Sequence, residues 1–100
     1  MSALECYLQA LEIDQNHLPS IFNLACNYEQ LEQPEKARQH FLHAVKVDPD
    51  WPQALYGLSL VCIKLNEAAE AVTHLTRALH LSPTSEPIKY LLALSYKKMN

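Results

Sequence analysis

The chain has 100 residues, of which 49% are hydrophobic and 19% charged, and its formal net charge is −3. This balance is typical of one small folded domain. A single glycine excludes a glycine-rich phosphate-binding loop, and three cysteines without a CxxC pair indicate neither a disulfide framework nor a zinc site.

The apolar residues follow a helical period along the chain, and no segment alternates as a strand would. Ser2 and Glu5 have the spacing of a capping box at the start of the first expected helix. Asn66 and Ser85 are candidate caps for the fifth and sixth helices. We therefore predict an all-α fold of about six helices, spanning residues 3–14, 19–31, 34–47, 52–65, 67–81 and 86–98.

One residue pattern returns at an offset of 34 residues. Its first form has four positions: an alanine, then an aromatic residue or leucine, then a second alanine, then a proline. It occurs as Ala37, Phe41, Ala44, Pro49 and again as Ala71, Leu75, Ala78, Pro83. A second form lies between these copies, as Ile21, Leu24, Ala25, Tyr28, then Leu55, Leu58, Ser59, Cys62, then Lys89, Leu92, Ala93, Tyr96. A fixed period with two helical segments in each copy indicates a repeat array.

The pattern resembles the tetratricopeptide repeat, and it departs from that family at Cys62, where an aromatic residue is usual. The resemblance implies a right-handed α-solenoid, a superhelix of antiparallel helix pairs. On this basis residues 1–17 are the second helix of an incomplete repeat, 18–51 and 52–85 are full repeats, and 86–100 are the first helix of another incomplete repeat.

The resemblance also implies that the first helix of each repeat lines a concave groove that binds proteins. The second form of the pattern is the packing stripe of each first helix. The groove candidates lie one residue after this stripe, and they are Phe22, Cys26, Glu29, Tyr56, Leu60, Ile63, Tyr90, Leu94 and Lys97. Phe22, Tyr56 and Tyr90 would form an aromatic ladder, which offers a large contact area at low rotamer cost. The alternative is that these aromatic side chains pack on neighbouring helices and bind nothing.

Family members that hold the C-terminal carboxylate of a chaperone use a clamp of Lys, Asn and Arg side chains. At the corresponding places this chain has Phe22, Cys26, Gly57, Pro87 and Leu91. A shift by one repeat lets Asn23, a further groove candidate, fit the middle position, but Gln53 and Gly57 then fail the third. A co-chaperone-type domain would therefore carry its clamp outside this segment.

No catalytic residue, cofactor or metal site is expected. His40 and His43 lie one turn apart and His74 repeats His40, but equivalent places in stacked repeats are too far apart to share an ion easily. We interpret these histidines as solvated surface residues and Cys62 as a small core residue. No Ser/His/Asp or Cys/His grouping has a supporting loop, although a metal-dependent or hydrolase activity abolished by His40→Ala would favour an enzyme.

The sequence therefore predicts an interaction module that binds an extended or helical segment of a partner protein by aromatic and apolar contacts, with Glu29 and Lys97 as charged ends. A second hypothesis is head-to-tail self-assembly. No Lys or Arg precedes Lys36, whereas Lys89, Lys97 and Lys98 follow Ser85, so an acidic end would meet a basic end.

Several classes of partner and location are not expected. Clustered Arg and Lys along one face, the footprint of a nucleic-acid-binding protein, do not occur. No apolar run approaches the ~18 residues of a membrane span, and the first residues do not have the pattern of a signal peptide. With free thiols, this predicts a cytoplasmic protein that does not insert into membranes.

Overall fold

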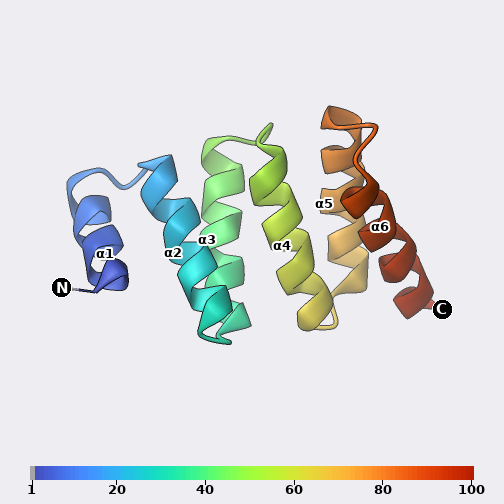
Figure 1. The fold of residues 1–100 in the computed structure, drawn as a ribbon, viewed down its shortest axis with the longest axis horizontal. Coiled ribbons are helices and arrows are strands. Elements are labelled where there is room, and N and C mark those ends of the chain that lie inside the picture. Colours follow the sequence, from blue (N-terminus) through green and yellow to red (C-terminus); the bar gives the residue numbers. More distant parts are fainter. Residues whose placement is uncertain (1) are drawn as a thin grey trace.

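The computed structural model describes residues 2–100, which form six helices joined by short turns. The helices are α1 (Ala3–Ile13), α2 (Leu18–Gln30), α3 (Pro34–Val47), α4 (Pro52–Lys64), α5 (Ala68–Leu81) and α6 (Glu86–Met99). They follow one another in chain order along the long axis of the molecule, with the termini at opposite ends (Figure 1). The molecule measures 43 × 25 × 18 Å. This row of helices, without a strand in residues 2–100, confirms the predicted all-α solenoid.

The 34-residue period is visible in the backbone at the helix ends. Asp14, Asp48 and Ser82 each close a helix by donating the backbone N–H to the carbonyl four residues earlier. Glu32 and Asn66, also 34 apart, both adopt the left-handed conformation, with φ of 58° and 62°. Equivalent residues in successive repeats therefore make equivalent turns.

One of the three expected helix caps forms as predicted. Ser2 accepts a hydrogen bond from the backbone N–H of Glu5 at 3.2 Å, as the capping box predicts. The assignment of Asn66 as the cap of the fifth helix is wrong, because its left-handed backbone ends α4 and the N-cap of α5 is Glu67. Ser85 does occupy the N-cap position of α6, but within residues 2–100 its side chain makes no capping hydrogen bond.

The core lies between successive helices rather than at one centre. Four alanines of α3 and α5 are fully buried, namely Ala37, Ala44, Ala71 and Ala78. Their small side chains let the helices approach closely, and the larger Phe41 and Leu75 fill the space between them. Each layer therefore depends on its neighbouring helix, as expected for a repeat array.

The packing face of α6 differs from the expected one. Ile88, Leu91 and Ser95 are buried there, whereas Lys89 and Tyr96 of the predicted stripe are exposed. In α2 and α4, the residues at the same repeat positions are covered by the helix that follows in the chain, α3 or α5. Within residues 2–100, α6 packs only on α5 and α4, so none of these residues covers the opposite side of this helix.

Ion pairs connect side chains of neighbouring repeats. Arg38 of α3 pairs with Glu70 of α5, and Lys64 of α4 pairs with Glu29 of α2. Pairs that remain accessible to water stabilise a protein by only ~0–1 kcal/mol each. We therefore expect these pairs to fix the alignment of neighbouring helices more than to stabilise the fold. Within residues 2–100, none of the helices has both the length and the apolar character needed to cross a membrane.

Candidate functional site

A cavity of about 610 Å³ lies where α2, α4 and the start of α6 face one another. We call it the α2–α4 groove. Its wall consists of Phe22, Cys26, Glu29, Phe41, Pro52, Gln53, Tyr56, Gly57, Leu60, Ser82, Ser85, Pro87 and Ile88. Most of these side chains come from the first helix of each repeat, because consecutive first helices touch each other only slightly and leave space between them.

Five of the ten groove residues expected from the sequence line this cavity, namely Phe22, Cys26, Glu29, Tyr56 and Leu60. All five are partly buried. The lining of the cavity thus includes half of the residues at the spacing that the repeat pattern indicated, and their contact with a ligand stays a prediction.

The other five expected residues lie elsewhere. Ile63 is buried in the core, and Asn23 is exposed on α2. Tyr90, Leu94 and Lys97 are on α6 beyond the cavity wall, and Tyr90 is 68% exposed. Only the first turn of α6, through Pro87 and Ile88, reaches the groove, so the three aromatic positions are not equivalent in the structure.

Phe22 is braced by two other rings. Its centroid lies 4.7 Å from that of Trp51, and it meets Phe41 edge to face at 5.9 Å. Aromatic pairs in such geometry stabilise each other by ~0.5–1.5 kcal/mol beyond their buried area. Phe22 thus lines the groove and also packs on neighbouring aromatic rings. This packing is the alternative role that the sequence left open.

The charge on the groove comes from a single residue. Glu29 is the one charged side chain among the lining residues, and its carboxylate pairs with Lys64. Burial raises the pKa of the Cys26 thiol, and the negative charge of Glu29 raises it further. Cys26 is consequently a protonated, apolar part of the wall instead of a reactive thiolate.

The sequence did not identify Phe41 and Gly57 as groove residues. Gly57 is the only glycine of the chain, and it lies in the middle of a helix, where glycine costs ~1 kcal/mol relative to alanine. A glycine in the interior of a helix often indicates that another group approaches the backbone closely. Here that group is the ring of Phe41, which reaches the groove through the space that a side chain at 57 would occupy.

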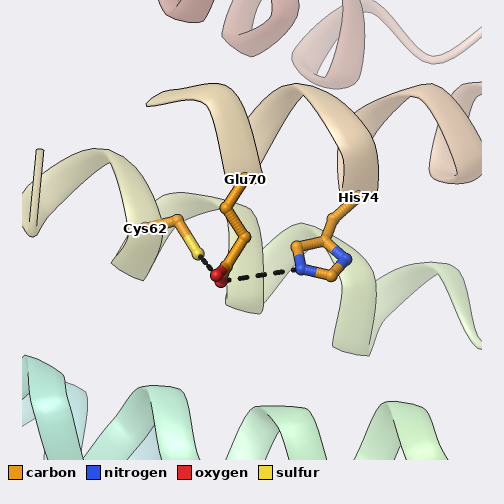
Figure 2. A group of neighbouring side chains, drawn as sticks. All are labelled: Cys62, Glu70 and His74. Carbon is orange, nitrogen blue, oxygen red and sulfur yellow. Dashed lines mark hydrogen bonds and ion pairs between the residues drawn. The ribbon is translucent and has the colours of Figure 1, made fainter. Parts of the chain in front are cut away.

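A second group of chemically active side chains lies between α4 and α5. The ligand atoms of Cys62, Glu70 and His74 are all within 4.8 Å of one another, and Figure 2 shows the three side chains converging. The interpretation of His74 as a solvated surface residue is wrong, because only 17% of its side chain is accessible. Cys62 is fully buried, as expected for a core residue.

Comparison with known families decides the identity of the repeat. Family models of the tetratricopeptide repeat match residues 20–51 and residues 52–85. The chain belongs to the tetratricopeptide repeat family. Membership in this family supports a role in protein–protein interaction. A comparison with curated protein sequences finds no match.

Solved tetratricopeptide structures share this fold. The crystal structure of MamA is 25% identical, with a TM-score of 0.92 over 96% of this chain and 56% of the MamA chain. The first tetratricopeptide domain of Spaghetti (RPAP3), bound to the HSP90 peptide SRMEEVD, is 20% identical, with a TM-score of 0.90 over 96% of this chain and 76% of that one. The second such domain of human RPAP3, in complex with an HSP70 peptide, is also 20% identical, with a TM-score of 0.86 over 93% of this chain and 78% of that one. The chain thus spans just over half the length of MamA.

The groove of this tetratricopeptide array differs chemically from a carboxylate clamp. No lysine or arginine is among the residues that line it. Besides Glu29, its polar lining residues include Gln53, Ser82 and Ser85, and the surface is largely apolar.

Proposed function

We propose that the chain is an interaction module that holds an apolar segment of a partner protein in the α2–α4 groove. The observation that carries this proposal is a cavity of about 610 Å³ whose wall presents Phe22, Tyr56 and Leu60 around one charged residue. Pockets of ~300–1,000 Å³ with apolar walls and a few polar groups are the usual form of a binding site. Such a site fits one or two large side chains of a peptide or helix.

The groove also indicates which partners it disfavours. The HSP90 peptide bound by the RPAP3 domain carries three acidic residues in SRMEEVD. In this chain the charged side chain at the groove is Glu29, and no lysine or arginine lines the groove to pair with the acidic residues of such a segment. We therefore propose a partner segment whose central residues are aromatic or aliphatic and whose flanking charge, where it approaches Glu29, is positive.

Peptides selected by phage display against the folded chain test this proposal. We expect the selected peptides to be rich in apolar residues and to lose more than about tenfold in affinity when Tyr56 is changed to Ala, since aromatic side chains dominate such contacts. Tyr90→Ala is the matched control, because Tyr90 is exposed on α6 outside the lining. Circular dichroism confirms that each variant is folded. Equal losses in the two variants, or no loss in Tyr56→Ala, would contradict the proposal.

A second candidate function is head-to-tail self-assembly, and the observation that favours it is the open side of α6. Tyr90 and Tyr96 are exposed on this helix, as are Lys97 and Lys98. At the other end of the row, α1 has no buried residue and exposes Leu8 and Ile13 beside its acidic residues. We propose that the occupant of the α6 surface is α1 of a second copy, because both surfaces are apolar and their charges are opposite.

Sedimentation velocity at low and high salt tests this second function. We expect oligomers that dissociate as salt is added, because screening weakens attraction between exposed charges. The paired substitution Lys97→Glu and Lys98→Glu should give monomers at low salt, whereas Lys46→Glu, on the exposed surface of α3, should not. A monomer at every salt concentration would rule out self-assembly.

A further inference from the structure

The group of Cys62, Glu70 and His74 has the composition and the geometry of a metal site, and the interaction role of the chain does not use it. Cys62 Sγ lies 2.9 Å from Glu70 Oε2, and His74 Nε2 lies 3.7 Å from the same oxygen. Ligand atoms around a tetrahedral zinc ion are roughly 3.3–3.7 Å apart, as bonds of about 2.0–2.3 Å require. The three ligand atoms, all within 4.8 Å of one another, would need shifts of up to about 1 Å to surround one ion.

The ring nitrogen of His74 that faces Glu70 is a second, independent observation. His74 Nε2 is buried and has no hydrogen-bond partner among residues 2–100, since 3.7 Å to the carboxylate is too long for a hydrogen bond. A buried polar atom without a partner is costly and calls for an explanation. In Figure 2 this nitrogen points at Glu70, and Cys62 approaches the same carboxylate from the other side of the view.

We propose that Cys62, Glu70 and His74 bind one divalent zinc ion between α4 and α5. Thiolate and imidazole ligands favour Zn²⁺ over Mg²⁺ and Ca²⁺, which prefer oxygen ligands. Glu70 and His74 are one helical turn apart on α5, and Cys62 approaches them from α4, so the ion would connect the two helices of the repeat. With three protein ligands, one coordination position would remain for an exchangeable group.

The protonation states of the ligands determine what binding requires. Arg38 lowers the pKa of Glu70 to about 2, and burial lowers the pKa of His74, so at neutral pH the carboxylate is ionised and the imidazole is neutral. Burial raises the pKa of Cys62 to about 12, so this residue is a thiol. As the metal–sulfur bond forms, the thiol proton is released to solvent. One proton leaves for each ion bound, and binding therefore strengthens as the pH rises.

Arg38 is the group that opposes the ion. Its guanidinium donates Nε–H to Glu70 Oε2 at 3.1 Å and also pairs with Oε1 of the same carboxylate. A cation next to the site repels a divalent ion and competes for Oε2. Arg38→Gln removes the charge and keeps a hydrogen-bond donor, so this variant should bind the metal more tightly than the unchanged chain does.

Titration of the folded chain with Co²⁺, a spectroscopic substitute for Zn²⁺, tests the proposal. We expect a thiolate-to-cobalt charge-transfer band that saturates at one ion per chain and disappears when Zn²⁺ is added. Cys62→Ala and His74→Gln should abolish the band. The control Cys26→Ala removes the half-buried thiol of the groove and should leave the band unchanged.

Arg38→Gln keeps the test decisive if Cys62→Ala reduces stability. We expect the cobalt titration of Arg38→Gln to saturate at a lower concentration than that of the unchanged chain. The absence of a charge-transfer band in both the unchanged chain and Arg38→Gln would overturn the proposal. A band that persists in Cys62→Ala would do the same, because another thiol would then be the ligand.

Discussion

A Cβ atom added to Gly57 of α4 would come within 2.6 Å of Cε1 of Phe41 in α3. Cβ atoms essentially never approach another heavy atom so closely, so the helix tolerates the ring only because residue 57 has no side chain. Phe41 is 3% exposed and also contacts Phe22. The only glycine of the chain thus fixes the position of a ring that forms part of the groove.

Gly57→Ala should destabilise the chain even though alanine is the better helix former. Overpacking costs ~1–3 kcal/mol, and replacing glycine by alanine in a helix interior recovers ~1 kcal/mol of that. We expect a net loss of about 1 kcal/mol in the free energy of unfolding, measured by urea denaturation. A gain in stability would show that the Phe41 ring moves aside freely.

Phe22 and Tyr56 should differ in what they contribute to stability. Phe22 packs on Trp51 and Phe41, whereas no aromatic ring is seen against Tyr56 within residues 2–100. We expect Phe22→Ala to lower the free energy of unfolding by ~2–3 kcal/mol, somewhat less than a fully buried phenylalanine, and Tyr56→Ala to lower it less. The reverse order in thermal or urea unfolding would contradict the assignment of Phe22 to the wall and Tyr56 to the binding surface.

The ion pair of Arg38 and Glu70 should make stability depend on pH in the acid range. The folded chain lowers the pKa of Glu70 from its ordinary value of 4.5 to about 2, chiefly through the hydrogen bonds from Arg38. A carboxyl group with a lowered pKa stabilises the fold above pH 4.5, and this stabilisation is lost as the pH falls towards 2. Because both side chains are about one third accessible, we expect it to be on the order of 1 kcal/mol.

Glu70→Gln and Arg38→Gln should therefore flatten the same part of the stability profile. The free energy of unfolding, measured by urea denaturation between pH 2 and pH 5, is the appropriate readout. The double variant should show no further flattening, since either substitution removes the same interaction. Profiles parallel to that of the unchanged chain would show that the pair does not affect stability.

The repeat period allowed most of the fold to be predicted from the sequence. Small residues such as Ala37 and Ala71 recur at 34 residues because each repeat must make the same close contact with its neighbour. Helix ends were less predictable. Asn66 has the chemistry of an N-cap and also of a left-handed C-terminal residue, and only its backbone conformation distinguishes the two.

The candidate site was predictable only where repeats have neighbours on both sides. Phe22 and Tyr56 lie on helices covered by the next helix, and both line the groove. Tyr90 has the equivalent place in the sequence but lies on α6, whose packing differs. The environment of His74 could not be inferred either, because it depends on burial and on Arg38, which comes from another helix.

The most direct test of the interaction surface is an amide chemical-shift map recorded while a selected apolar peptide is added to the isotope-labelled chain. We predict that the largest shifts occur at Phe22, Tyr56 and Leu60, and that they saturate together as the groove fills. Shifts confined to Tyr90 and Lys97 on α6, or to the surfaces of α3 and α5 away from the groove, would contradict the account.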